Sequence, residues 1–233
     1  MFNNLNPASN AGVIEKEVIM SYLQQEKAYL DSGLIENYLA GTDILVLKEF
    51  TDNKSMIEKF SRKYGEDNHP KIVLCGLNPG RFGAGKTGIP FIDYDSLSCL
   101  IDGVTRHDKE RSAQFFYDVV QTIGPKLFYE TFYVTNVSFV GYTRQGKNLN
   151  YYDLPDEAKA FVYSQFRNEM AQVAPSKIVS LGGAVKRTVT DLFSGSDIDI
   201  SHQLPHPNYC AFPKNYAVCK RRYIELLQSF LKG

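Results

Sequence analysis

Apolar residues occur along the chain in two patterns, short continuous runs and longer stretches with helical spacing. Four short runs bounded by turn residues predict buried strands: residues 71–76 (KIVLCG), 131–137 (TFYVTNV), 177–182 (KIVSLG) and 198–204 (IDISHQL). The longer stretches predict helices over residues 112–123, 155–173, 184–193 and 214–231. Strands that alternate with helices are typical of βαβ units. We therefore expect an α/β fold, a three-layer α/β/α sandwich around a short, mostly parallel four-stranded central sheet.

The N-terminal part carries a different signal. Apolar side chains recur at near-helical spacing over residues 13–31, which predicts an amphipathic helix that Gly33 would end. We expect this helix to belong to a helical extension of about residues 1–65, with the core of the fold over about residues 70–231. Both parts together would form one domain over residues 1–233. The stretch 83–108 is too long and irregular for an ordinary connection, which indicates a functional loop.

Composition narrows the classes of function. The chain has 233 residues and is 43% hydrophobic, enough to bury one core, and its 26 basic and 26 acidic residues cancel. A whole-molecule positive field is therefore absent, and any nucleic-acid contact must use local patches. No run of about eighteen apolar residues and no signal peptide is found, so we expect a soluble, cytoplasmic monomer. The four cysteines lack C-x-x-C spacing, so we expect no metal and no cofactor.

Residues 80–87 (GRFGAGKT) match the G-x-x-x-x-G-K-[ST] phosphate loop of nucleotide hydrolases. In such a loop the lysine and threonine open a helix, whose N-terminus holds the phosphates. Here Gly88 and Pro90 follow at once, and both disfavour a helix at that point. The predicted strands also lack a terminal aspartate to hold magnesium. We therefore expect the match to be fortuitous and keep nucleotide hydrolysis as a minor alternative.

Three separate segments share a second resemblance, in the same order as in a known family. They are GLNPGRFGAGKTGIPF (76–91), TNVSFVGYTRQGKNL (135–149) and LPHPNYCAFPKNY (204–216). The first resembles the first motif of the uracil-DNA glycosylase superfamily, and most closely that of its single-strand-selective monofunctional (SMUG-like) branch. The others look like that branch's middle segment and second motif. The resemblance covers roughly residues 70–231 and implies a uracil-DNA glycosylase-like fold.

The resemblance also implies a reaction, the hydrolysis of an N-glycosidic bond in DNA. Negative charge flows onto the departing base while the sugar becomes oxocarbenium-like. His206 would donate a hydrogen bond to the uracil O2 as this charge builds, and Asn78 would orient the attacking water. An amide cannot act as a base near pH 7, so we expect a modest rate. No lysine falls on the motif positions, so we expect water rather than an amine to attack.

Base recognition is assigned in the same way. The base must leave the helical stack, and Phe91 matches the aromatic platform on which it would lie. Asn136 matches the residue that reads the base edge, because its carboxamide can pair with both N3–H and O4 of uracil. The remaining predicted base-binding residues lie in the first motif; they are Gly76, Leu77, Gly80 and Ala84. The small Ala84 side chain would leave room at C5 of the base, so 5-hydroxymethyluracil is a second candidate substrate.

The predicted partner is DNA, single- or double-stranded, that contains uracil or a related base. The loop after His206 would fill the space that the base vacates, and it has Cys210 where the family usually has an arginine. Other contacts are expected from the turn before residue 184 and from a basic rim that includes Arg144. The predicted DNA-binding residues are Asn208, Tyr209, Cys210, Phe212, Gly183, Lys186, Lys147 and Lys214.

Cys210 and the absence of a motif aspartate leave one further alternative open. A relative that binds DNA or nucleobases without catalysis would carry the same segments. It would bind uracil-containing DNA and release no base.

Overall fold

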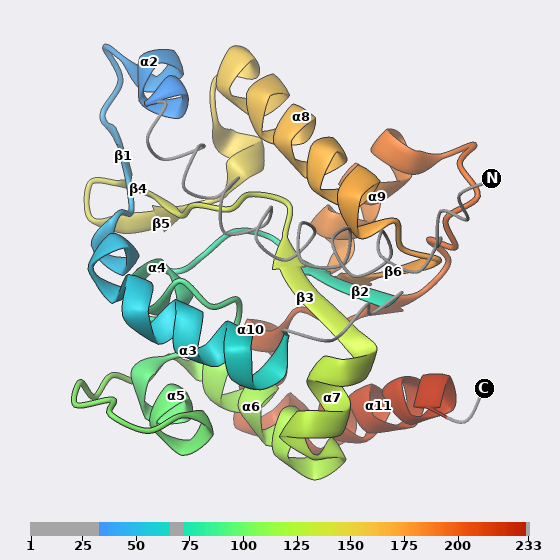
Figure 1. The fold of residues 1–233 in the computed structure, drawn as a ribbon. Coiled ribbons are helices and arrows are strands. Elements are labelled where there is room, and N and C mark those ends of the chain that lie inside the picture. Colours follow the sequence, from blue (N-terminus) through green and yellow to red (C-terminus); the bar gives the residue numbers. More distant parts are fainter. Residues whose placement is uncertain (1–32, 66–71, 232–233) are drawn as a thin grey trace, which may run out of the picture.

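The computed structural model describes residues 33–65 and 72–231 (Figure 1). The helix predicted over residues 13–31 lies outside them. At the centre is a four-stranded parallel sheet in the order β3-β2-β6-β7. Its strands are β2 (Ile72–Gly76), β3 (Phe132–Asn136), β6 (Lys177–Leu181) and β7 (Gln203–Leu204). The predicted strand positions and the parallel four-stranded sheet are thus confirmed.

The fourth strand is shorter than predicted. Only Gln203 and Leu204 pair as a strand with β6, and Asp199 makes an isolated bridge to Lys177. Between them the chain turns, because the Asp199 carboxylate accepts hydrogen bonds from the backbone N–H and the hydroxyl of Ser201. Such side-chain bonds to the backbone two residues on compete with strand pairing.

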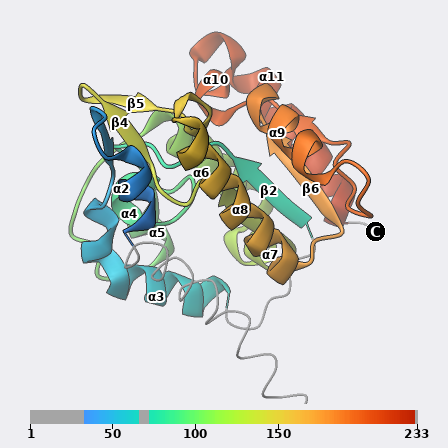
Figure 2. The same ribbon diagram turned by 90° about the horizontal axis from the view of Figure 1, so that it is seen from above.

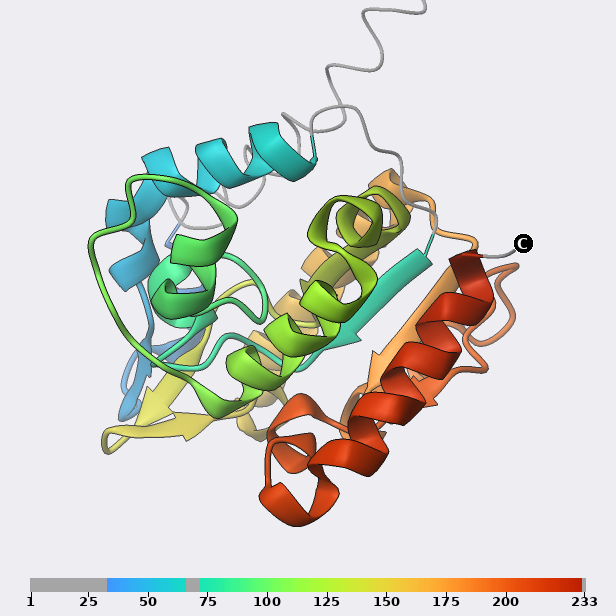
Figure 3. The ribbon, with the colours of Figure 1, turned by 90° about the horizontal axis from the view of Figure 1, so that it is seen from below.

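Side chains of the sheet alternate between two helical layers, as the period of two in a strand requires. On β2, Val73 and Cys75 belong to the same core cluster as helices α8 (Asp156–Val173) and α9 (Gly183–Phe193), which cover the face seen in Figure 2. Leu74 belongs to the core on the opposite face. There it packs with α6 (Arg111–Ile123), α7 (Pro125–Thr131) and α11 (Pro213–Leu231), the near layer in Figure 3. The α/β/α sandwich is confirmed.

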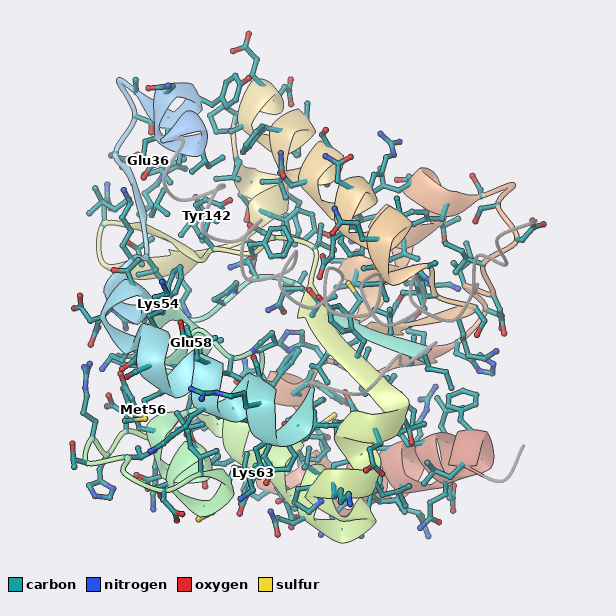
Figure 4. All side chains as sticks on the ribbon, viewed as in Figure 1. Glu36, Lys54, Met56, Glu58, Lys63 and Tyr142 are labelled. Atoms are coloured by element: carbon teal, nitrogen blue, oxygen red, sulfur yellow. The ribbon has the colours of Figure 1, made fainter. Side chains whose placement is uncertain are left out.

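The four long helices agree with the predicted stretches, and several shorter elements were not predicted. Within the expected helical extension they are α2 (Leu34–Leu39), the 3-10 helix η2 (Glu49–Asn53) and α3 (Lys54–Tyr64). Beyond it they are α4 (Ala84–Thr87), α5 (Tyr94–Leu100), α7, the 3-10 helix η3 (Tyr151–Asp153) and α10 (Pro207–Cys210). On α3, Lys54 and Glu58 form an i,i+4 ion pair at the surface (Figure 4). None of the helices in residues 33–65 and 72–231 has the length and apolar character that crossing a membrane requires.

A second, antiparallel sheet lies beside the first and was also not predicted. It consists of β1 (Ile44–Val46), β4 (Tyr142–Arg144) and β5 (Lys147–Leu149). Gln145 and Gly146 join β4 to β5 with φ of 49° and 71°, the two positive angles of a type I′ hairpin turn. Tyr142 of β4 is fully buried, and its hydroxyl lies 2.9 Å from the Ser138 hydroxyl (Figure 4). This sheet brings the middle sequence segment alongside the first one.

Candidate active site

The carboxyl ends of β2 and β3 meet at one edge of the central sheet. Gly76 pairs with Asn136 as the last residue of each strand, and the Asn136 side chain is buried. A Cβ on Gly76 would lie 2.4 Å from Asn136 Oδ1 and 2.3 Å from Cζ of Phe91. Only glycine therefore allows the carboxamide and the aromatic ring to approach the strand end so closely.

Phe91 lies in a turn that gives its backbone an unfavourable positive φ and places its ring against Phe116. The Ile92 N–H donates to the Ile89 carbonyl oxygen at 3.1 Å, with Pro90 second in the turn and Phe91 third at a φ of 58°. These are features of a type II turn, which favours proline at the second position and normally glycine at the third. A bulky residue at positive φ is strained, and such strain is concentrated at functional sites. The ring stacks on Phe116, with centroids 4.8 Å apart.

Buried polar groups on either side hold this turn in place. The Thr87 hydroxyl donates to the Ile92 carbonyl oxygen at 2.7 Å, and the Asp93 carboxylate caps α5 by accepting from the Ser96 N–H. Asp93 also accepts from the Glu110 N–H and the Gln114 side chain, which ties the turn to the start of α6. These bonds fix the strained conformation before any ligand binds.

His206 reaches the same place from the segment that follows β7. It is the N-cap of α10, and its Nδ1 accepts a hydrogen bond from the Asn208 N–H at 3.1 Å. Its ring centroid lies 6.5 Å from that of Phe91. Burial lowers the pKa of His206 to about 4, so the ring is neutral at pH 7. Because Nδ1 accepts, the single ring hydrogen sits on Nε2, which remains as a donor.

Asn78 lies two residues beyond Gly76, and backbone groups at the end of the middle segment and just after it hold its carboxamide. Its Oδ1 accepts from the Tyr151 N–H at 3.1 Å, and its Nδ2 donates to the Leu149 carbonyl oxygen at 3.2 Å. These bonds fix which atom is oxygen and which is nitrogen. An amide oxygen has two lone pairs, so Oδ1 can accept a further bond from a water molecule.

Taken together, the three sequence segments meet at the carboxyl edge of the sheet. Contacts join Gly76, Phe91, Asn136 and His206 directly, and Asn78 follows at the end of β2. This edge is where open α/β sheets usually bind ligands. The arrangement offers an aromatic face, a buried carboxamide, a neutral imidazole donor and an amide that can hold water.

The phosphate-loop match has a structural explanation. Lys86 and Thr87 end the single turn of α4 instead of opening a helix, because Gly88 follows at a φ of 77°. The Lys86 ammonium pairs with the Asp108 carboxylate at 2.6 Å, and the Thr87 hydroxyl is used in the Phe91 turn. Neither side chain is arranged to hold a nucleotide phosphate.

The other residues predicted to bind the base have mixed placements. Leu77 is half-buried, and its carbonyl oxygen accepts from the Ser138 N–H. Gly80 makes room for another side chain, since a Cβ there would lie 2.2 Å from Oε1 of Glu110. Ala84 is buried at the start of α4. Its influence on the choice of base stays a prediction.

Some of the residues predicted to bind DNA are exposed, whereas others are buried or already bonded to another part of the protein. Cys210 is fully buried with its thiol 3.6 Å from the Pro205 carbonyl oxygen, so it packs in the interior and not at the surface where DNA would lie. The Lys186 ammonium donates to the Ile200 carbonyl oxygen, and Arg144 pairs with Asp43. The other members are exposed at the surface: Asn208, Tyr209, Phe212, Gly183, Lys147 and Lys214.

Several residues at this edge were missed by the sequence reasoning. Phe116 supports the Phe91 ring, and the Glu110 carboxylate fills the space beside Gly80 and Gly83. Burial raises the pKa of Glu110, and nearby Asp93 adds to this effect while a bond to Ser112 opposes it. Gly80 and Gly83, which lack side chains, were the one signal in the sequence that another side chain packs against this loop. Among residues 33–65 and 72–231, no three His, Cys, Asp or Glu side chains are grouped to hold a metal ion.

Comparisons with known proteins agree with this geometry. Residues 62–228 match the family described as "Uracil DNA glycosylase superfamily". The crystal structure of wild-type Pedobacter heparinus SMUG2 is similar over 86% of this chain and 96% of its own, with a TM-score of 0.70 and 26% sequence identity. None of the curated proteins matches significantly. The family match covers all three segments, and the SMUG2 likeness confirms the predicted resemblance to the SMUG-like branch. The chain therefore belongs to the uracil-DNA glycosylase superfamily.

Proposed function

We propose that the protein is a monofunctional DNA glycosylase that hydrolyses the N-glycosidic bond of uracil in DNA. The product is an abasic site, which begins base excision repair. The observation that carries this proposal is the approach of Phe91 and Asn136 to Gly76, with the neutral His206 ring 6.5 Å from Phe91. Membership of the superfamily supports it.

Recognition of the base uses the first two of these side chains. The extruded uracil lies on the Phe91 ring, which Phe116 supports from behind. The Asn136 carboxamide accepts from N3–H of uracil and donates to O4. Cytosine presents the opposite pattern at these atoms, and a buried polar group left unpaired costs about 1–3 kcal/mol. Uracil is therefore preferred to cytosine.

Departure of the base depends on His206. As the glycosidic bond breaks, negative charge builds on O2 of the uracil ring, and the Nε2–H donates to it. A neutral imidazole is sufficient, because the charge that it stabilises exists only in the transition state and the product. Loss of one such donor typically costs about 2.7–4 kcal/mol of transition-state stabilisation.

Asn78 places the water that attacks the sugar. Its Oδ1 accepts one hydrogen bond from the Tyr151 N–H and a second from the water. The water's oxygen adds to C1′, the bond to the uracil N1 breaks, and the electron pair of that bond leaves with the base. The attacking water then loses a proton to the solvent, and the uracil anion takes one up from the solvent. The amide orients the water without removing its proton, so the rate is modest compared with that of an aspartate enzyme.

A gel assay tests this proposal. Single- and double-stranded oligonucleotides, each with one uracil, 5-hydroxymethyluracil, xanthine or hypoxanthine, are incubated with the protein and then treated with alkali. We expect the strand to be cut at the uracil position when alkali is added and to stay intact without alkali. Asn78→Ala should slow this cleavage by at least about 100-fold, since misplacing a reactant costs that much. Leu127→Ala, which changes an exposed side chain on α7, is the matched control.

Two outcomes contradict the proposal. Absence of alkali-dependent cleavage with every base, together with retained binding to uracil-containing DNA, would identify a non-catalytic binding protein. Cleavage without alkali would show that an amine of the protein attacks the sugar and forms a Schiff base.

A further inference from the structure

Two arginine–aromatic pairs lie at the surface beside the candidate site. The guanidinium carbon of Arg81 is 4.5 Å from the Phe82 ring centroid, and that of Arg111 is 5.9 Å from the Phe212 centroid. Phe82 is 46% exposed and Phe212 is 42% exposed, whereas Phe91 in the pocket is 8% exposed. We call Arg81, Phe82, Arg111 and Phe212 the arginine–aromatic rim.

The first turn of α6 connects the two pairs. Glu110 lies directly against the loop that carries Arg81 and Phe82, since a Cβ on Gly83 would be 2.1 Å from its Oε2. The next residue in the chain is Arg111, which contacts Phe212. The loop that follows β2 and the segment that follows α10 are thereby held along one surface beside the carboxyl edge of the sheet.

The cations of this rim are not neutralised by carboxylates. Within the two described ranges, neither Arg81 nor Arg111 forms an ion pair, in contrast to Arg106, which pairs with Glu49. The Arg81 guanidinium donates instead to the Gly146 carbonyl oxygen, and the backbone N–H of Arg81 donates to Oδ1 of Asn148 at 3.2 Å. The β4–β5 hairpin thus holds Arg81 in place and leaves its charge available to an anion.

Exposed aromatic rings beside unpaired guanidinium groups have the chemistry of a single-strand binding surface. Nucleobases stack on aromatic side chains without regard to sequence, and arginine contributes phosphate and cation–π contacts. In a duplex the neighbouring bases are already stacked and paired, so stacking them on Phe82 or Phe212 would stabilise the complex less. The surface therefore fits a single strand better than a duplex.

We propose that the arginine–aromatic rim binds single-stranded DNA by stacking the nucleotides that flank the extruded base. Phe82 and Phe212 each stack one of these flanking nucleobases. The inference rests on the proposed function only in that the candidate site takes the extruded base. It adds a stacking contact at Phe82, outside that site.

The test is a binding measurement that does not require base release. Dissociation constants are measured by fluorescence anisotropy for single strands that carry one uracil nucleotide whose glycosidic bond resists hydrolysis, and in which one other nucleobase at a time is replaced by an abasic spacer. We expect Phe82→Ala to weaken binding to the intact strand about 5- to 150-fold, the range for one stacked base. The wild type should lose the same factor with one particular spacer, and Phe82→Ala should lose nothing further with it. Phe82→Trp should restore binding, and Leu127→Ala should behave as the wild type.

Three results would overturn the inference. Phe82→Ala could bind every strand as tightly as the wild type, or lose the same factor with every spacer. Alternatively, Phe82→Ala could change the sedimentation of the free protein and not its DNA binding, which would make the rim a contact between two copies of the chain. If the anisotropy measurement shows stacking at Phe82 and the gel assay shows no base release, only the proposed function is overturned. Base release with no effect of Phe82→Ala would overturn only the inference.

Discussion

At the residue scale, backbone groups hold polar atoms of the candidate site in place. Asn78 bonds to the backbone at Leu149 and Tyr151, and His206 accepts from the Asn208 N–H. Backbone partners fix which atom of each side chain donates and which accepts. The candidate site is thereby preorganised, which lowers the entropy lost on binding.

Asn78→Asp tests the donor role of the amide. The nitrogen that donates to the Leu149 carbonyl oxygen becomes a carboxylate oxygen, which faces that carbonyl at 3.2 Å with no hydrogen between them. We expect the free energy of unfolding to fall by about 1–3 kcal/mol at pH 7. Urea unfolding measures it, with Asn78→Ala as the comparison. Equal stability of Asn78→Asp and the wild type would contradict the described bond.

His206 predicts a dependence of stability on pH. Its pKa is about 4 in the folded chain and about 6.5 in an unfolded one, so between these values only the unfolded chain binds the proton. The contribution of His206 to the free energy of unfolding therefore falls as the pH drops from 7, by about 2 kcal/mol at pH 5. The measurement compares the wild type with His206→Asn, which keeps a side chain suited to an N-cap. A difference that stays constant from pH 7 to pH 5 would show that the ring titrates normally.

At the element scale, the ends of strands and the turns after them position the candidate site. Some of these elements could be predicted from the sequence and others could not. The central strands were predicted from short continuous apolar runs bounded by turn residues, and the long helices from a period of about 3.6. The β4–β5 hairpin was missed because its strands have three residues each, too few to show a period. The packing of Glu110 against Gly80 joins positions thirty residues apart, and no local pattern encodes such a contact.

Gly76→Ala tests the meeting of strand ends. The added Cβ would overlap Phe91 and Asn136, at 2.3 Å and 2.4 Å. We expect a loss of about 1–3 kcal/mol of stability from overpacking and at least a tenfold loss of base release. The stability control is Gly183→Ala, where the nearest atom to an added Cβ is 3.9 Å away. A fully active and stable Gly76→Ala would mean that neither side chain is needed at the strand end.

At the scale of the whole molecule, function depends on convergence of segments from distant parts of the chain. The three motifs implied that Asn78, Asn136 and His206 would meet beside Phe91. The spacing at Gly76 and between the rings brings Asn136 and His206 to Phe91, and the place of Asn78 beside them stays a prediction. The motifs could not predict that Cys210 turns inward, because burial at that position depends on how α10 packs against α6 and α11. A net charge of zero leaves DNA binding to a few local cations.

Salt dependence tests this view of the charge. Each phosphate contact adds about −0.7 to the slope of log K against log salt for single strands. The exposed Lys214 forms no ion pair with a residue in the described ranges, so we expect Lys214→Gln to make the slope less steep by about 0.7. Lys186→Gln is the comparison, since that ammonium already donates to the Ile200 carbonyl oxygen. Equal slopes for Lys214→Gln and the wild type would remove Lys214 from the DNA surface.

The most direct test of the central claim is a crystal structure with a single strand that carries a uracil nucleotide whose glycosidic bond resists hydrolysis. We predict an extruded uracil parallel to the Phe91 ring, its N3 and O4 at the Asn136 carboxamide and its O2 within hydrogen-bond distance of His206 Nε2. A water molecule should lie between Asn78 Oδ1 and C1′ of the sugar. A uracil bound elsewhere, or one that stays in the strand with this edge of the sheet unoccupied, would contradict the account.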